Sequence, residues 1–492
     1  MTAAAQIQPE RRDEADRAAL AYLVVGFAML LVMGIFGLVM RLDQAGLWVI
    51  APDRFYAVMT LHGIGMVAAS LLAAMGGMIG VLGGTVRLDA RMLWTALVLS
   101  LIGSGFVVFA TLVGDFGAGW TVLYPLPFDS QGAWTRWAAL AALFGILLVA
   151  VAFLLYCLEL LRATVAHAGG LGRALALDYL FSFGRRGAAS VPSPAQLVAT
   201  VVAIDGVVTV LAGAVYLVPQ FAIAAGLISG VNALFAKNFL YLFGHTLANL
   251  TIYLAAALVY ATLPHYTGRE WKSTWPVVLG LNLVIILVLL PYPHHLYQDF
   301  AQPIWLQVVG QIGSYGVAVP AFLVTIIGGM GQIYRSGMRW QVATILFAIG
   351  LWGWTVGGIG AVIDATIPVN QIMHNTLWVP AHFHTYYLLG ALAFSTGYMY
   401  HLIGARSGGG ETTFSRAAAW LYGLGGAGFV LMLFVSGGMS VPRRFAMHIA
   451  AWQWPDKISV AFVGVSAIAL AWLGGECLIR LKAAWAGQAT PP

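Results

Sequence analysis

Histidines inside apolar segments are the residues of this chain with the clearest capacity for chemistry. Six of its histidines lie in such segments: His62, His245, His294, His295, His382 and His384. Polar groups are costly in lipid and mark functional sites there. Imidazole is a ligand for copper, iron and zinc and a common axial ligand of haem iron. The six residues together therefore predict a metal or haem site.

One pair of these histidines is separated by a single phenylalanine. On an α-helix, residues i and i+2 point about 200° apart, so His382 and His384 cannot share one ligand. We therefore expect His382 to hold one haem from one face of its helix. His384, together with His62 from another segment, could hold a second haem on the opposite face.

The other pair is directly adjacent in the chain. Neighbouring residues on a regular helix diverge by about 100°, so His294 and His295 can reach one metal only from an irregular backbone. Pro291 and Pro293 predict that irregularity, because proline removes a helix donor and disrupts the turn. With His245 the pair would then form a three-imidazole metal site.

The composition predicts the elements that position these residues. The chain has 492 residues, of which 61% are hydrophobic and 9% charged, and its mean hydropathy is +0.87. Soluble proteins carry about 25% charged residues, so we expect an all-α integral membrane protein with one domain over 1–492. Apolar runs of spanning length predict twelve helices: 19–40, 55–83, 92–114, 134–161, 196–225, 236–263, 275–292, 304–333, 340–363, 376–402, 416–438 and 457–479.

The basic residues predict the orientation of these helices. An even number of spans places both termini on one side, and 17 of the 24 Lys and Arg residues fall on that side. The positive-inside rule makes it cytoplasmic. We thus expect a multi-pass protein of the cell inner membrane, with a polar cytoplasmic N-terminus (1–18) and a cytoplasmic loop at about 163–195. In this orientation all six histidines lie in the outer half of the membrane.

Several classes of function are disfavoured by what the sequence lacks. The two cysteines, Cys157 and Cys477, form no disulfide framework and have no zinc spacing. Glycine-rich stretches do not follow a strand, so nucleotide binding is not expected. The net charge of +6 is explained by the basic residues on the cytoplasmic side of the membrane. It therefore gives no reason to expect binding of nucleic acid. A polytopic transporter with structural histidines remains an alternative, distinguished by the absence of haem absorbance.

Six motifs give the chain a resemblance to a known family: Met59–Gly63, Gly117–Pro125, Gly244-His245, Pro293–His295, His374–His384 and Val441–Arg444. The chain resembles the catalytic subunit I of the haem–copper oxidase superfamily, especially its B-type branch. The resemblance implies two haems of unspecified type and one non-haem metal, copper rather than iron. Because the chain has no dicopper motif, it also implies an electron donor, either a copper-bearing subunit II or a cytochrome c.

The resemblance implies a role for each histidine. His62 and His384 match the axial ligands of the low-spin haem, and His382 matches the ligand of the high-spin haem. The ligands of the second metal are matched by His245, His294 and His295. Arg443 and Arg444 match an arginine pair near the haem propionates, since guanidinium pairs with carboxylates through two parallel hydrogen bonds. His374 matches a histidine near the same groups.

One position departs from the oxygen-reducing members of the family. B-type oxygen reductases carry a tyrosine four residues after the first metal-ligand histidine, where this chain has Asn249. A second branch places its tyrosine six residues before the His-His pair, where this chain has Val288. Reduction of NO to N2O breaks no O–O bond, and the chain resembles oxidase-derived nitric oxide reductases here. We therefore predict NO as the gas, with reduction of O2 to water as the alternative.

Other tyrosines could replace the missing one. Tyr241 lies one turn before His245, and Tyr292 and Tyr297 flank the His-His pair. An oxygen reductase would need one of them in contact with the metal site, because effective chemistry requires close positioning. The alternative for Asn249 itself is a hydrogen bond to a neighbour.

The polar residues that could carry protons also depart from the B-type pattern. Asn370 occupies the place of an acidic residue four positions before the propionate histidine. Tyr260, Ser314 and Gln311 could line a cytoplasmic route, but Ala256 interrupts the usual tyrosine series. The sequence therefore does not predict proton pumping.

Overall fold

Long helices make up almost the whole structure, a computed structural model that describes residues 9–407 and 411–488. Eleven helices of this part are long and apolar enough to cross a membrane. The long helices are α1 (Pro9–Gln44), α2 (Pro52–Gly83), α3 (Ala90–Leu112), α4 (Arg136–Ala168), α7 (Pro194–Ala225), α8 (Ala233–Thr267), α9 (Trp275–Leu287), α10 (Ile304–Ala321), α12 (Val342–Asp364), α16 (Thr413–Gly438) and α17 (Gln453–Gln488). The predicted all-α membrane fold is confirmed.

Shorter elements connect or extend these helices. They are α5 (Leu171–Ala174), α6 (Leu177–Phe181), η1 (Ala188–Ser190), η2 (Tyr292–Leu296), η3 (Phe322–Ile327), α11 (Gly328–Ile333), α13 (Ile367–Met373), α14 (Trp378–His384), η4 (Thr385–Leu392), α15 (Ala393–Ser407) and η5 (Ala450–Trp452). The elements η3 and η4 are π-helical, whereas the other three η elements are 3₁₀-helical.

The tenth predicted span, 376–402, which is absent from those eleven helices, is a single helical run made of three pieces. It starts as α14, widens into the π-helix η4 and continues as α15. A π segment adds residues to the turn and is common at functional sites. Here it begins directly after His384, so the change of helical register lies next to the predicted haem ligands.

Local sequence explains where the long helices begin and end. Ser193 and Gln196 form a reciprocal capping box at the start of α7, with Pro194 in the first turn. Asn232 caps α8 by accepting a hydrogen bond from the Phe235 N–H. Both helices end at a glycine with positive φ, Gly226 and Gly268. Such residues stop a helix at little steric cost.

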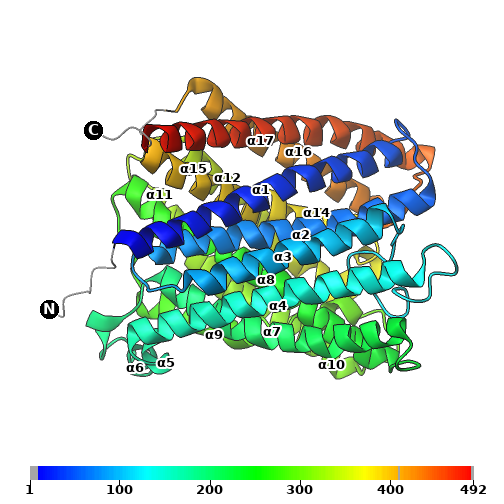
Figure 1. The fold of residues 1–492 in the computed structure, drawn as a ribbon, viewed down its shortest axis with the longest axis horizontal. Helices are drawn as coiled ribbons and strands as arrows, with labels where there is room; N and C mark the ends of the chain where they lie inside the picture. Colours follow the sequence, from blue (N-terminus) through cyan, green and yellow to red (C-terminus); the bar gives the residue numbers. More distant parts are fainter. Residues whose placement is uncertain (1–8, 408–410, 489–492) are drawn as a thin grey trace.

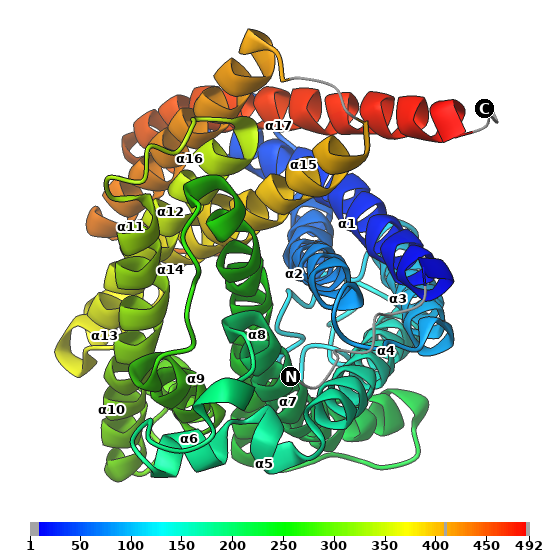
Figure 2. The same ribbon diagram turned by 90° about the vertical axis from the view of Figure 1, so that its left-hand side faces the viewer.

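Both ends of the described chain lie at the same end of the helix bundle. In Figure 1, α1 begins and α17 finishes on the left, and the short helices α5 and α6 lie there too. Figure 2 views the molecule from that end. An even number of crossings requires this arrangement, and it agrees with the predicted topology.

Helical structure extends into both of the segments predicted as polar, 1–18 and 163–195. The polar segment 1–18 is helical from Pro9 onward, and 1–8 lie outside the described residues. The loop predicted at 163–195 contains the end of α4 and the short helices α5 and α6. The reason is the same in both cases. Hydropathy marks the apolar length of a helix, whereas the hydrogen-bonded helix extends beyond it into polar sequence.

Candidate metal and haem site

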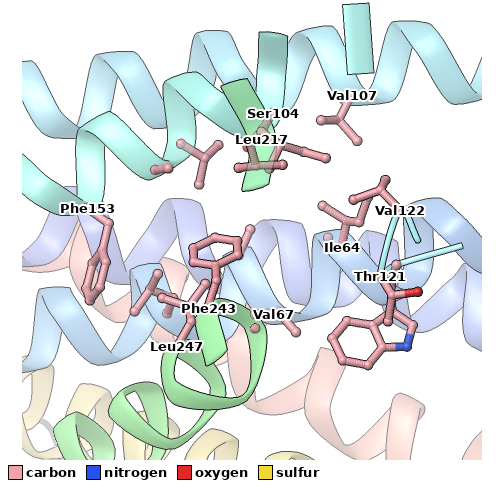
Figure 3. Close-up of a pocket in the computed structure, with 18 of the residues that line it drawn as sticks. Ile64, Val67, Ser104, Val107, Thr121, Val122, Phe153, Leu217, Phe243 and Leu247 are labelled. Carbon is pink, nitrogen blue, oxygen red and sulfur yellow. The ribbon is translucent and has the colours of Figure 1, made fainter. Parts of the chain in front are cut away.

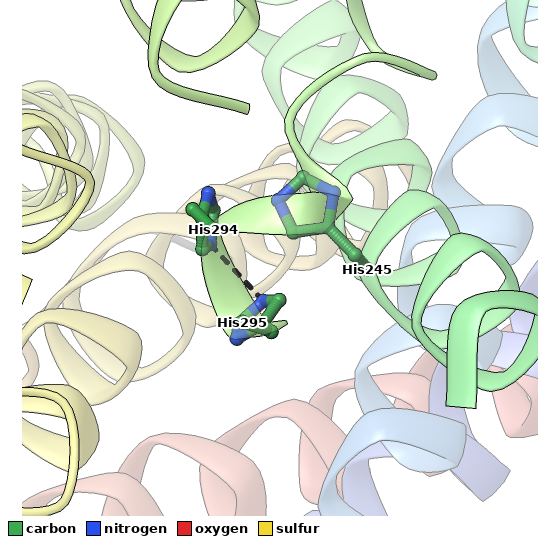
Figure 4. A group of neighbouring side chains, drawn as sticks. All are labelled: His245, His294 and His295. Atoms are coloured by element: carbon green, nitrogen blue, oxygen red, sulfur yellow. Dashed lines mark hydrogen bonds between the residues drawn. The ribbon is translucent and has the colours of Figure 1, made fainter. Parts of the chain in front are cut away.

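Three imidazoles from two elements converge in the interior. One ligand nitrogen from each of His245, His294 and His295 lies within 4.8 Å of the others. Figure 4 shows the three rings turned toward one another, with the dashed line joining the adjacent pair. The helix α9 stops at Leu287, and the pair lies on the 3₁₀ element η2 instead. The irregular backbone predicted from the prolines is therefore confirmed.

Nδ1 of His294 has a defined hydrogen-bond partner, the hydroxyl of Ser314. The Ser314 hydroxyl donates to the carbonyl oxygen of Gly310 at 2.7 Å. It is therefore free to accept from Nδ1–H of His294, 3.0 Å away. This arrangement leaves Nε2 of His294 unprotonated and directed at the cluster, where it lies 3.1 Å from Nε2 of His295. Partners of this kind fix the tautomer and orientation of metal-binding histidines.

A second pair of imidazoles has the geometry of axial ligands. Nδ1 of His62 lies 2.8 Å from the carbonyl oxygen of Met33, and Nδ1 of His384 lies 2.7 Å from that of Pro380. Each ring thus keeps Nε2 free. The ring centroids are 6.2 Å apart with planes 15° from parallel. Metal–imidazole bonds are about 2 Å long, so two imidazoles on opposite sides of one ion place their centroids about 6 Å apart. The pair fits a haem.

His382 lies on the other side of the same helix, as the i, i+2 spacing predicts. It is buried, and neither ring nitrogen has a hydrogen-bond partner among the described residues. Oδ2 of Asp364 lies 3.9 Å from its Nε2. A Cβ on Gly360 would lie 2.8 Å from Cβ of His382, so α12 backs this histidine closely. Buried polar atoms normally have partners, so these orphaned nitrogens fit an axial ligand of a second haem.

All six histidines line one internal cavity of about 350 Å³. Their predicted convergence is therefore observed. Asn249, Tyr241, Arg443 and Arg444 line it as well. A cavity of this size lies within the range that protein sites use for cofactors and ligands.

Arg443 and Arg444 lie on a loop whose backbone is hydrogen-bonded to the segment before α14. The Arg443 N–H donates to the carbonyl oxygen of Asn375 at 2.9 Å, and Thr376 forms an isolated bridge with Pro442. Burial and the neighbouring Arg444 lower the pKa of Arg443 to about 10, so it stays a cation at neutral pH. This cationic wall suits carboxylates such as haem propionates.

His374 is buried beside this wall. Its ring centroid lies 5.9 Å from that of His295, and its Nδ1 lies 3.3 Å from Nδ2 of Asn370. Burial, assisted by the charges of Arg443 and Arg444, lowers the pKa of His374 to about 3. The imidazole is therefore neutral near pH 7 and offers hydrogen bonds without charge.

Asn249 lies against the first metal-ligand candidate. Its amide nitrogen donates to the backbone carbonyl of His245 at 2.9 Å and lies 3.3 and 3.4 Å from the two ring nitrogens. The hydrogen bond to a neighbour that we considered is thus present. The side chain nevertheless faces the cavity and occupies the place next to the metal site.

Of the three alternative tyrosines, one contacts the metal cluster. Tyr241 stacks on His295, with centroids 5.1 Å apart and planes 17° from parallel. Tyr292 instead donates to Asn238 and Tyr297 to the carbonyl oxygen of Ala365, both at 3.2 Å. Only Tyr241 among these is placed to act on the cluster.

The residues considered for proton transfer are dispersed. Tyr260 and Thr325 share a hydrogen bond of 2.5 Å. Gln311 accepts from the Ile367 N–H at 2.8 Å, which is a structural contact. Asn370 donates to the backbone of Asp364 at 2.7 Å. These contacts do not form one connected chain to the cavity.

One cluster at the cavity wall was not predicted. Arg41, counted in the sequence only as an outer charge, is buried and forms an ion pair of 2.6 Å with Asp456. Asp456 also lies 2.5 Å from Nδ1 of His448. Arg41 and Gln44 line the cavity on the side of His384. The sequence carries no signal for this contact, because its partners are 415 residues apart.

A second, apolar cavity of about 130 Å³ adjoins the first. It lies among α2, α3, α4, α7 and α8, with side chains such as Ile64, Val107 and Phe243 facing it (Figure 3). His245, His295 and Tyr241 line both cavities. Two of the three imidazoles of the cluster, His245 and His295, therefore border an apolar space.

The chain is similar to known proteins. Residues 17–467 match the family model described as cytochrome c and quinol oxidase polypeptide I. The chain is 27% identical over 273 residues to cytochrome c oxidase subunit 1 of Thermus thermophilus, covering 52% of this chain and 47% of that protein. It is 25% identical over 256 residues to cytochrome c oxidase polypeptide 1 of Halobacterium salinarum, covering 50% and 42%. These matches span about half the length of each relative.

A longer match and a structural one extend this similarity. The probable cytochrome c oxidase subunit 1-alpha of Streptomyces avermitilis is 23% identical over 463 residues, 87% of this chain and 73% of that protein. A cryo-EM structure of a heme–copper terminal oxidase dimer superposes with a TM-score of 0.76 at 18% identity, covering 96% of this chain and 84% of that one. At that identity the likeness concerns the fold alone.

Proposed function

Because the chain belongs to the cytochrome c and quinol oxidase polypeptide I family, we propose that it is the catalytic subunit of a terminal reductase that converts NO to N2O. Membership makes it a haem–copper oxidase subunit I and an oxidoreductase, which disfavours the transporter alternative. The gas, the placement in the B-type branch and the role of each site residue belong to the proposal. The observation that carries it is Asn249 beside His245, where an oxygen reductase of that branch has tyrosine.

The ligand assignments follow the fit of the residues. His62 and His384 would hold the low-spin haem, and His382 the high-spin haem. The cluster of His245, His294 and His295 would hold the non-haem metal. Imidazole suits both copper and iron, and the choice of copper follows the family resemblance. When bound, these groups supply the electron transfer and the gas-binding chemistry.

The chain's own residues orient and enclose that chemistry. Ser314 and two backbone carbonyls set the tautomers of His294, His62 and His384. Arg443 and Arg444 would bind the haem carboxylates. The apolar lining of the second cavity would suit an uncharged diatomic gas better than an ion. None of these roles distinguishes NO from O2.

The choice of gas rests on what Asn249 cannot do. Reduction of O2 to two waters consumes four electrons and four protons and cleaves an O–O bond. Reduction of two NO to N2O and water consumes two electrons and two protons and forms an N–N bond. A tyrosine can give an electron and a proton during O–O cleavage, whereas an amide can give neither. A chain with Asn249 at this place is suited to the second reaction.

Reduction of O2 is the second candidate, and Tyr241 favours it. This hydroxyl-bearing ring stacks on His295 at the cluster, and the relatives compared above are named cytochrome c oxidases. If Tyr241 replaced the missing tyrosine, Tyr241→Phe would abolish O2 turnover while keeping the stacked ring and the metal. If the enzyme reduces NO, the same variant keeps most of its NO turnover.

The proposal also covers the location of the protein and its electron donor. The protein would lie in the cell inner membrane with both termini in the cytoplasm. It would receive electrons from subunit II or a cytochrome c, since such partners serve this family.

The test compares gas turnover in three forms of the purified complex. Wild type and Asn249→Ala should both reduce O2 slowly, because neither has a hydroxyl at this place. Asn249→Tyr should gain O2 turnover, and haem spectra serve as the folding control. Fast, cyanide-sensitive O2 turnover by the wild type with negligible N2O would refute the proposal.

A further inference from the structure

Two histidines that line neither cavity lie side by side at the end of the bundle that carries the termini. His265 is in the last turn of α8, and His401 is in α15. Their ring centroids are 5.2 Å apart, with planes 70° from parallel. Beyond this end of α8, Trp275 of α9 donates to the carbonyl oxygen of Leu180 in α6, one of the short helices at the same end in Figure 1. His265 is exposed and His401 is half-buried, so a dissolved ion can reach the pair.

The separation of the two rings is the one that a single tetrahedral ion would impose. With a zinc–nitrogen bond of about 2.0–2.1 Å, each ring centroid lies about 3.2 Å from the ion. Two such rings at the tetrahedral angle place their centroids about 5 Å apart. His265 and His401 match this value. The ring of His245 in the buried cluster lies at similar distances, 5.0 and 5.4 Å, from the two histidines of η2.

The ring of His401 also has an outer partner of the kind that metal-binding histidines use. Its Nδ1 lies 3.1 Å from the hydroxyl oxygen of Tyr266, the residue after His265 on α8. When Nδ1–H donates to this oxygen, Nε2 is left unprotonated and able to bind an ion. The Ser314 hydroxyl serves His294 of the buried cluster in the same way.

The remaining ligands of such an ion would come from solvent. Among the described residues, no Cys, Asp, Glu or further His joins the pair at the spacing of the buried cluster. Imidazole is a ligand for divalent zinc, copper and nickel, and four-coordinate zinc accepts water in positions that the protein leaves open. A site with two imidazoles and water can take up and release its ion, because it stays open to solvent.

We propose that His265 and His401 form a second metal site, which takes a zinc ion from the side of the termini. The ion would join two helical segments that also hold the ligands proposed for the catalytic centres. α8 carries His245, and the run that ends as α15 carries His382 and His384. Zinc would therefore tie the two segments together at the end of the bundle that carries the termini. This role does not depend on which gas is reduced.

Zinc binding by the purified, haem-loaded complex tests the site. After equilibrium dialysis against zinc chloride, the wild type should hold one zinc ion per chain more than the double variant His265→Asn/His401→Asn. The matched control His167→Asn removes an exposed histidine from the last turn of α4 and should keep the ion. X-ray absorption at the zinc edge should show imidazole nitrogens at about 2.0 Å in the wild type. Haem spectra report folding in each variant.

Two further variants separate metal binding from simple packing of the rings. His265→Cys removes the ring contact but should retain the ion, because thiolate is also a zinc ligand. Tyr266→Phe keeps the ring contact and should weaken zinc binding by about 10–100-fold. Zinc should raise the melting temperature of the wild type and leave that of the double variant unchanged. Equal zinc content in the wild type and the double variant would overturn the proposal, as would bound zinc without imidazole ligands. No gas turnover is measured, so a wrong assignment of the gas leaves this test intact.

Discussion

Substitution of Ser314 by alanine should loosen the non-haem metal without disturbing either haem. The Ser314 hydroxyl accepts the Nδ1–H of His294 at 3.0 Å and is itself fixed by donating to Gly310 at 2.7 Å. Alanine keeps the helix and removes the group that holds the His294 tautomer. Loss of such an outer partner weakens metal binding 10–100-fold as a rule, or about 1.4–2.7 kcal/mol.

The assay is retention of metal by the purified complex after dialysis against a graded series of chelator concentrations. Ser314→Ala should release its metal at chelator concentrations about 10–100-fold lower than the wild type. Thr355→Ala is the matched control. It loses the same kind of backbone hydrogen bond, to Leu351 at 2.8 Å, on a helix turn without a metal-ligand histidine. Identical metal retention in Ser314→Ala and Thr355→Ala would refute the reasoning.

Two further outcomes are expected from other parts of the molecule. Gly37→Ala should reduce the haem content from two per chain to one, because its Cβ would lie 2.6 Å from Cε1 of His62. The control Gly105→Ala, whose Cβ meets nothing within 4 Å, should keep both haems. Equal haem content in the two variants would contradict the prediction. The hydrogen bond from Lys237 lowers the pKa of Asp299. This pair thus stabilises the folded state at pH values above the pKa of Asp in the unfolded chain, about 4, and the stabilisation is lost as the pH falls below it. Asp299→Asn should therefore lower thermal stability slightly, by at most about 1 kcal/mol, near pH 7, and a difference that grows on acidification would be inconsistent with that cause.

The sequence was sufficient to predict the fold and the meeting of six histidines around one cavity. Hydropathy predicts the spans because a helix must be apolar over the thickness of the bilayer to cross it. The depth of each histidine along its span predicts their meeting, since helices of similar length share one membrane frame. The adjacent pair with its prolines predicts an irregular backbone, and η2 confirms it.

Contacts that depend on side-chain packing could not be predicted. The pairing of Arg41 with Asp456 joins the first and last long helices, and no local pattern encodes it. Stacking of Tyr241 on His295 depends on how α8 is rotated about its axis against η2. The carboxyl oxygens of the buried Asp205 have no hydrogen-bond partner among the described residues. The sequence shows where that acid lies along its own helix but not what surrounds it.

The most direct test of the central claim is the gas balance of the purified wild-type complex under anaerobic conditions with a reducing donor. The reasoning from Asn249 predicts that two NO disappear for each N2O formed, at a rate that exceeds O2 consumption by the same preparation. Rapid, cyanide-sensitive O2 consumption, with NO left unreduced, would show that the chain reduces oxygen despite Asn249.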